Sequence, residues 1–165
     1  MTNINTFQGD VFIHEYIKHT GDDNNLFGFS GTDTFKIATA GADAMTVQSN
    51  GNVGIGTATS DNRLHIYNNA DNVGYVMENN ARTYTMGIRG DTSDVFAITD
   101  DTAGAFRMTV QSNGNVGIGT ATSDSRLHIY NNSDNIAYVI ENNARTYSMG
   151  IRGDTSDVFA ITDDT

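Results

Sequence analysis

Histidines and acidic turns are the residues of this chain whose chemistry could support a metal site. His65 and His128 lie 63 residues apart in matching stretches, so copies around a symmetry axis could bring equivalent imidazoles onto one ion. The turns at 22–25, 91–94 and 100–101 carry hard oxygen ligands that suit Ca²⁺. None of them has the ligand spacing of an EF-hand loop or of a glycine-rich calcium repeat. We therefore expect solvated turns, structural histidines and neither a metal nor a cofactor.

A glycine-rich stretch and the scattered serines could be taken for a phosphate loop or a hydrolase site. The segment 54–57, Gly-Ile-Gly-Thr, lacks both the lysine of a P-loop and the third glycine of a dinucleotide loop. No nucleophile-elbow pattern occurs, and a repeated unit would duplicate any Ser-His-Asp triad. Glu78 and Glu141 are the repeated glutamates, and they do not single out a carboxylate pair for glycoside cleavage. The sequence predicts a protein that is not an enzyme.

The elements that carry these residues recur along the chain. Residues 45–102 and 108–165 have nearly the same sequence, which is typical of proteins that stack one structural unit repeatedly. The last unit stops partway through the pattern, as expected for a piece of a longer array. The six differences are Asn62/Ser125, Ala70/Ser133, Val73/Ile136, Gly74/Ala137, Met77/Ile140 and Thr85/Ser148. The predicted organisation is a polar lead at 1–10, a divergent first unit at 11–44, and units at 45–107 and 108–165.

Alternation of apolar and polar residues predicts short β-strands, for example in 64–67 and 83–89. The same alternation places Phe106, Met108 and Val110 on one face. Turns rich in Asn, Asp and Gly separate the strands roughly every ten residues, which is the spacing of all-β folds. We predict an all-β fold of tandem 63-residue repeats, built of short antiparallel strands and stacked along a fibre axis. The apolar stripe expected to form the core is Tyr84, Met86, Ile88, Phe96, Ile98, Tyr147, Met149, Ile151, Phe159 and Ile161.

Composition argues against several classes of function. The formal net charge is −11 and the nine lysines and arginines are scattered, so no basic stripe for nucleic acid is present. The chain has no cysteine, and its start lacks the basic and apolar regions of a signal peptide. No apolar run approaches the ~18 residues of a membrane span, so we expect no membrane insertion. Small sheets of short strands bury too little apolar surface alone, which favours assembly with identical chains.

The segment Ser49–Thr57, followed by Leu64-His65-Ile66, resembles a motif of bacteriophage tail-fibre shafts. In that family a strand ends in a Gly-Asn turn, and Val-Gly-Ile-Gly-Thr, a short linker and a Leu-His-Val/Ile strand follow. The likeness covers the chain from about Val11 to Thr165. Ser60 and Ser123 stand where the family's linker usually has proline, so we expect the linker to bend differently here. The motif residues are Gly51, Asn52, Val53, Gly54, Ile55, Gly56 and Thr57, and their counterparts Gly114, Asn115, Val116, Gly117, Ile118, Gly119 and Thr120.

The resemblance implies a homotrimer of intertwined or side-by-side β-rich chains that forms the structural shaft of a host-attachment appendage. It implies as partners other copies of the chain, other tail or baseplate proteins, and a host cell-surface receptor reached through a distal region outside this chain. The implied location is the virion tail, made in the host cytoplasm and extracellular after release. Two alternatives of other classes remain: a glycan- or receptor-binding β-module, and a bacterial or archaeal extracellular filament or adhesin built from the same repeat.

Overall fold

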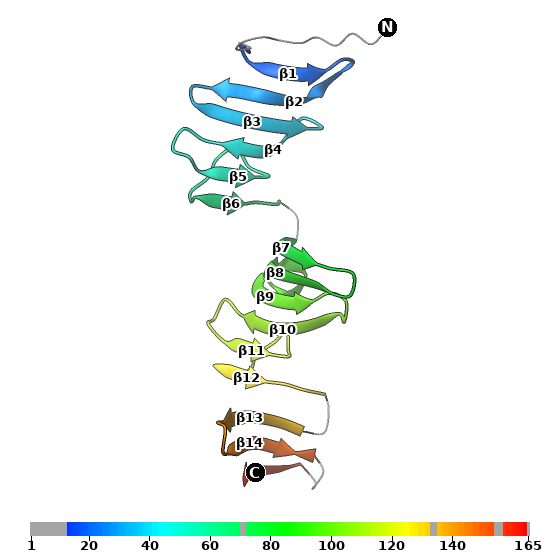
Figure 1. Cartoon of the computed structure of the whole chain (residues 1–165), viewed down its shortest axis with the longest axis vertical. Coiled ribbons are helices and arrows are strands. Elements are labelled where there is room, and N and C mark those ends of the chain that lie inside the picture. Colours follow the sequence, from blue (N-terminus) through cyan, green and yellow to red (C-terminus); the bar gives the residue numbers. More distant parts are fainter. Residues whose placement is uncertain (1–12, 70–71, 133–134, 154–156, 165) are drawn as a thin grey trace. The chain divides into compact units, whose positions relative to one another are not determined.

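The computed structural model of the chain describes residues 13–69, 72–132, 135–153 and 157–164. Within these ranges the secondary structure consists of β-strands and one short 3-10 turn, with no α-helix, which confirms the predicted all-β fold. The polar lead expected at 1–10 lies outside the described residues. The chain divides into two compact units, Met1–Asn69 and Ala70–Thr165 (Figure 1).

The first unit contains one six-stranded sheet, which we call sheet A. Its strands follow one another in space in the order of the sequence, from β1 to β6 (Figure 1). They are β1 (Tyr16–His19), β2 (Asp22–Gly31), β3 (Thr34–Thr39), β4 (Ala42–Val47), β5 (Val53–Ile55) and β6 (Leu64–Ile66).

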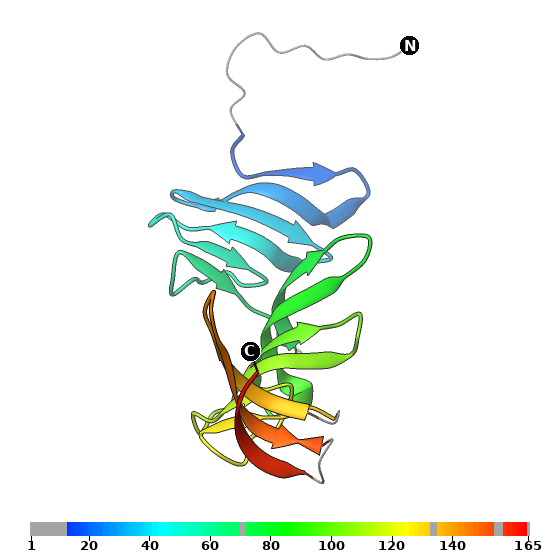
Figure 2. The same ribbon diagram turned by 60° about the horizontal axis from the view of Figure 1, so that its bottom comes forward.

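The second unit contains a six-stranded sheet, sheet B, and a three-stranded sheet, sheet C, again with sequential strand order. Sheets A and B are open and twisted, so each keeps two edge strands (Figure 2). Sheet B comprises β7 (Asn72–Glu78), β8 (Thr83–Arg89), the 3-10 turn η1 (Gly90–Thr92), β9 (Val95–Asp100), β10 (Ala105–Val110), β11 (Val116–Ile118) and β12 (Leu127–Ile129). Sheet C comprises β13 (Asn135–Glu141), β14 (Thr146–Arg152) and β15 (Val158–Asp163).

Strand boundaries recur with the period of the sequence. The strands β7, β8 and β9 return 63 residues later as β13, β14 and β15, and β4, β5 and β6 return as β10, β11 and β12. Pairing registers recur as well: Tyr75 pairs with Met86 as Tyr138 pairs with Met149. Positions 45 and 108, from which the sequence repeat is counted, lie inside β4 and β10. The six-stranded sheet B begins at β7, so the structural unit starts partway through the sequence repeat that is counted from residue 45.

The predicted antiparallel pairing is confirmed at the other strand pairs, but two pairs are parallel. The strand β5 runs parallel to β6, and β11 runs parallel to β12. Parallel neighbours need a connection that returns the chain to the same end of the sheet, which a tight hairpin cannot provide. Residues 119–126 make that crossover in sheet B, and residues 56–63 make it in sheet A. The sequence motif indicated where this linker lies, but it did not indicate that the strand after the linker would run parallel to the strand before it.

A β-bulge in β10 changes the face of one aromatic residue. Met108 pairs with Ile98, but Phe106 pairs with Thr99, so the register shifts across Arg107. Phe106 therefore lies on the same face as Arg89, whose guanidinium carbon is 6.0 Å from the ring centroid. The alternation predicted Phe106 beside Met108 and Val110, and that prediction is wrong because the bulge inserts one unpaired residue.

Candidate interaction surface

Sheet B has one face made of large apolar side chains. Cross-strand pairs place Met86 beside Tyr75 and Ile98, and Ile88 beside Val73 and Phe96. The face continues over β10 to β12, since Met108 pairs with Ile118, which pairs with Ile129. The predicted stripe residues Tyr84, Met86, Ile88, Phe96 and Ile98 all lie on this face, and each is half-exposed in the single chain.

Sheet C carries the same apolar face. Pairing brings Met149 beside Tyr138 and Ile161, and Ile151 beside Ile136 and Phe159. The remaining stripe residue of this sheet, Tyr147, pairs with Ile140. All five stripe residues of sheet C are exposed.

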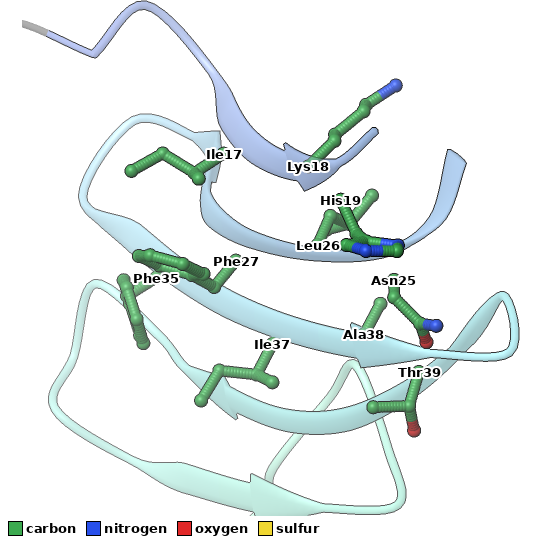
Figure 3. A pocket seen from close by; sticks show the side chains of 10 residues that line it. All are labelled: Ile17, Lys18, His19, Asn25, Leu26, Phe27, Phe35, Ile37, Ala38 and Thr39. Atoms are coloured by element: carbon green, nitrogen blue, oxygen red, sulfur yellow. The ribbon is translucent and has the colours of Figure 1, made fainter. Parts of the chain in front are cut away.

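Sheet A also has an apolar face, and it is hollowed. Phe27 lies between Ile17 and Ile37, and Phe29 packs edge-on against Phe35 with ring centroids 6.0 Å apart. An open hollow of about 470 Å³ is lined by side chains of β1, β2 and β3 (Figure 3). Each of the three sheets thus has a broad and partly exposed apolar face.

The opposite face of sheet B is covered by its own crossover. Thr109 Oγ1 donates to the carbonyl oxygen of Thr120 at 3.0 Å, and Asn115 Nδ2 donates to that of Ser123 at 2.9 Å. These bonds hold residues 119–126 against the sheet. On the face that this crossover covers, the side chains of Val95, Ala97 and Thr109 are buried. The two faces of the sheet therefore differ: one is closed by the chain itself, and the other is open.

The glycine-rich motif builds this crossover. A Cβ atom added at Gly117 would lie 2.5 Å from Thr109 Oγ1 and 2.7 Å from Ser123 Oγ, so only a glycine lets the crossover approach the sheet this closely. Gly119 has a φ of +76°, which turns the chain out of β11. Gly54 and Gly56 have the same roles in sheet A. The remaining motif residues form the turn, the short strands β5 and β11, and the start of each crossover. They are Gly51, Asn52, Val53, Ile55 and Thr57 and their counterparts Gly114, Asn115, Val116, Ile118 and Thr120.

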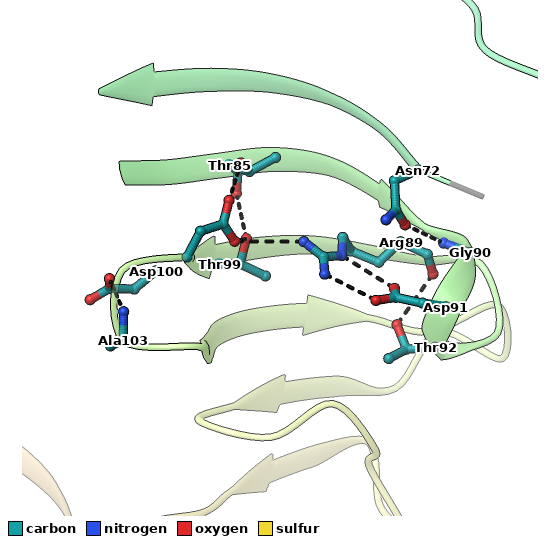
Figure 4. Close-up of polar contacts among 10 residues, drawn as sticks. Asn72, Thr85, Arg89, Gly90, Asp91, Thr92, Thr99, Asp100 and Ala103 are labelled. Carbon is teal, nitrogen blue, oxygen red and sulfur yellow. Dashed lines mark hydrogen bonds and ion pairs between the residues drawn. The ribbon is translucent and has the colours of Figure 1, made fainter. Parts of the chain in front are cut away.

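A buried aspartate joins β9 to β10. Arg107 Nη2 donates to Asp100 Oδ2 at 2.6 Å, and Arg82 Nη1 donates to the same oxygen at 3.0 Å. The Ala103 backbone N–H donates to Oδ1 at 3.0 Å (Figure 4). The hydrogen bond from Arg107 is the main cause that holds the pKa of Asp100 below its ordinary value, although burial opposes it. The prediction of a solvated turn at 100–101 is wrong for Asp100, because the bulge at Arg107 aims a guanidinium at it.

Neighbouring carboxylates are paired in the same way. Arg89 donates to both carboxylate oxygens of Asp91, at 3.3 and 3.0 Å, and Thr85 and Thr99 donate to Asp101 at 2.5 and 2.7 Å (Figure 4). These hydrogen bonds lower the pKa of Asp91 and of Asp101 from their ordinary values. The Asp101 carboxylate thereby links β8 to β9, and the Asp91 carboxylate fixes the turn that follows β8.

The repeated histidines lie on the crossover side of the sheets. His128 pairs with Gly117, and its ring stands edge-on to Tyr130 with centroids 6.3 Å apart. His65 has the same neighbours, Gly54 and Tyr67. In both residues Nδ1 is buried and finds no hydrogen-bond partner among the described residues. Within those ranges no group of three or more potential ligands is placed to hold a metal ion.

Comparison with known proteins assigns no family. No protein-family model matches the chain, and no curated protein matches it significantly. In the part of the chain that the structure describes, no helix has the length and apolar character to cross a bilayer. The feature of the molecule that calls for a functional explanation is thus the set of open apolar faces.

Proposed function

We propose that this chain is a non-catalytic structural segment of a homotrimeric β-fibre, of the kind that forms the shaft of phage tail fibres. The observation that carries the proposal is the distribution of apolar side chains. Among the described residues the buried hydrophobic ones are Ala38, Val95 and Ala97, whereas 25 large hydrophobic side chains are exposed. A stable protein does not leave such faces in water, because covering apolar surface is the main source of its stability.

Identical chains are the partners that this pattern favours. Sheets B and C present their apolar faces through corresponding strands in the same register, so copies of the chain offer matching surfaces. Closed symmetric assemblies of one chain are the common way to cover such surfaces. The number three comes from the resemblance of the glycine-rich motif to tail-fibre shafts.

The biological setting follows from the same resemblance. In this proposal the segment holds a distal adhesive region away from the virion, and its shaft connects to other tail or baseplate proteins. Contact with a host receptor belongs to a region outside these residues. The fibre is assembled in the host cytoplasm and becomes extracellular on release.

Sedimentation equilibrium on two matched variants tests the proposal. Ile88 lies on the apolar face of β8 and is 41% exposed, while Val76 lies on the opposite face of the neighbouring strand and is 55% exposed. We expect the unmodified chain to sediment at three times the 17.8 kDa of one chain. Ile88→Asp should dissociate the trimer because it places an unpaired carboxylate in the interface, and Val76→Asp should leave the trimer intact.

Two results would contradict the proposal. One is an unmodified chain that sediments as a monomer and keeps its β-sheet circular dichroism. The other is equal dissociation by Ile88→Asp and Val76→Asp, since the two faces would then not differ in function.

A further inference from the structure

The crossover of each six-stranded sheet covers polar atoms that have no hydrogen-bond partner among the described residues. They are Thr46 Oγ1, Ser60 Oγ and His65 Nδ1 in sheet A, and Ser123 Oγ and His128 Nδ1 in sheet B. Ser60 is 7% exposed and Ser123 is 6% exposed. A buried polar atom without a partner costs stability, and folded proteins seldom leave one. Because a serine hydroxyl and an imidazole nitrogen are left in this way in both sheets, they call for one common explanation.

In sheet A these atoms lie around a glycine of the motif. Gly54 pairs with Thr46 on one side and with His65 on the other, so the side chains of both neighbours lie on the face that the crossover covers. A Cβ atom added at Gly54 would lie 2.8 Å from Ser60 Oγ and 2.6 Å from the carbonyl oxygen of Thr57. The serine hydroxyl and the buried imidazole nitrogen therefore face the same region beneath the crossover.

Sheet B repeats this arrangement. Gly117 pairs with Thr109 and with His128, and a Cβ atom added there would lie 2.7 Å from Ser123 Oγ. Thr109 differs from its counterpart in sheet A because its hydroxyl donates to the carbonyl oxygen of Thr120 at 3.0 Å. A hydroxyl oxygen that donates can still accept. Both sheets therefore bring together a serine hydroxyl, a threonine oxygen and an imidazole nitrogen.

The backbone of each serine is held in place by neighbouring amides. The backbone N–H of Ser60 donates to Gln48 Oε1 at 3.0 Å, and its carbonyl oxygen accepts from Asn52 Nδ2 at 3.1 Å. The carbonyl oxygen of Ser123 accepts from Asn115 Nδ2 at 2.9 Å. These bonds fix the crossover on the sheet and keep the serine hydroxyl on its buried side.

We propose that each crossover binds one internal water molecule between the serine hydroxyl and the imidazole. The serine O–H donates to the water, and the water donates to Nδ1 of the histidine and to the threonine oxygen. Internal waters typically make about three hydrogen bonds, which these three groups supply. Since Nδ1 accepts, the proton of the neutral ring lies on Nε2. The site lies within one chain and does not depend on the assembly proposed above.

Relaxation dispersion of the water signal tests the site, because it counts long-lived internal waters in the full chain. Ser123→Ala removes one partner of the water in sheet B, and the count should fall by one. The double variant Ser60→Ala/Ser123→Ala should lose one water for each crossover. Ser125→Ala changes an exposed serine of the same crossover and should leave the count as it is in the unmodified chain. An unchanged count in the double variant would overturn the proposal.

Nuclear magnetic resonance of the unmodified chain gives a second readout that needs no variant. At a pH at which the imidazoles are neutral, the nitrogen-15 shifts should show Nε2–H rings for His65 and His128, with Nδ1 as a hydrogen-bond acceptor. Nuclear Overhauser effects should connect a long-lived water to the backbone N–H groups of Ser60 and Ser123, and the exposed His14 should show none. An Nδ1–H ring, or a serine hydroxyl that bonds the imidazole directly with no long-lived water beside it, would refute the site.

Discussion

Strands β9 and β15 have the same sequence and differ in surroundings. Val95 in β9 is 2% exposed, whereas its counterpart Val158 in β15 is 49% exposed. Asp100 is likewise buried between two arginines, whereas Asp163 is partly exposed. The difference arises because β10 and the crossover that follows lie against β9, and no described residue takes their place against β15. The strands of this repeat are therefore buried by the segment that follows them.

The apolar faces of the two sheets do not differ in this way. Met86 is 41% exposed and its counterpart Met149 is 45% exposed, although sheet B has three more strands than sheet C. The segment 105–129 thus covers one face of sheet B and leaves the other face open. In the assembly that we propose, another chain buries the open face. The repeat itself would then supply one part of the stability, and assembly would supply the other.

The largest expected effect comes from placing a charge at the covered strand. Val95→Asp should lower the free energy of unfolding of sheet B by on the order of 3 kcal/mol or more, because the carboxylate is buried without a partner. Val158→Asp should cost less than about 1 kcal/mol, since water reaches that position. Urea unfolding followed by hydrogen exchange in each sheet measures both values. Similar costs for the two variants would mean that the burial difference does not exist in solution.

The second effect is a dependence on pH that belongs to sheet B. The pKa of Asp100 is held below its ordinary value chiefly by the hydrogen bond from Arg107, so the folded state favours the ionised carboxylate. Its contribution to stability is present above the unfolded-state pKa of about 4, and it is lost as the pH falls through the lower folded-state pKa.

Asp100→Asn should therefore destabilise sheet B near neutral pH and flatten the loss of stability below about pH 4. Asp163→Asn should have the smaller effect near neutral pH, because Asp163 and its partner Arg145 are both partly exposed. Thermal unfolding between neutral and acid pH measures both variants. A steeper acid loss in Asp100→Asn than in the unmodified chain would contradict this assignment.

The smallest effect concerns two of the six differences between the copies. A methyl group added at Gly74 would lie 2.6 Å from Cγ2 of Thr85. The second copy has Ala137 and Ser148 at these places, so it gains one methyl and lacks the other, while the Ser148 hydroxyl still bonds Asp164 as that of Thr85 bonds Asp101. Gly74→Ala should cost about 1 kcal/mol, and adding Thr85→Ser should recover most of it.

A double-mutant cycle in the free energy of unfolding checks this coupling. The reverse substitutions in the second copy are the control. Ser148→Thr should destabilise sheet C while Ala137 is present, and the double variant with Ala137→Gly should be as stable as the unmodified chain. Additive effects in both sheets would show that the two differences are unrelated.

Alternation in the sequence was enough to predict the strands and the apolar face of sheets B and C. In 83–89 the side chains at every second position share a face, and Met86 of this face pairs with Ile98. The position of the turn glycines also predicted where strands end. These features depend on residues close together in sequence.

The buried cluster and the crossover could not be predicted in the same way. Asp100 follows a strand and precedes a second aspartate, which reads as a solvated turn, and its burial depends on a bulge that places Arg107 against it. The parallel pairing of β11 with β12 depends on how residues 119–126 pack on Thr109. Both features depend on contacts between different segments of the chain. The alternation of apolar and polar residues within one strand does not indicate such contacts.

Methionine oxidation tests most directly whether the apolar faces are covered by other copies of the chain. Met86 and Met149 lie on those faces, and an exposed thioether reacts readily with hydrogen peroxide. Peptide mapping of the unmodified chain should show both residues oxidised far more slowly than free methionine, and Ile88→Asp should restore fast oxidation at Met86. Oxidation of both residues at the rate of free methionine in the unmodified chain would contradict assembly through these faces.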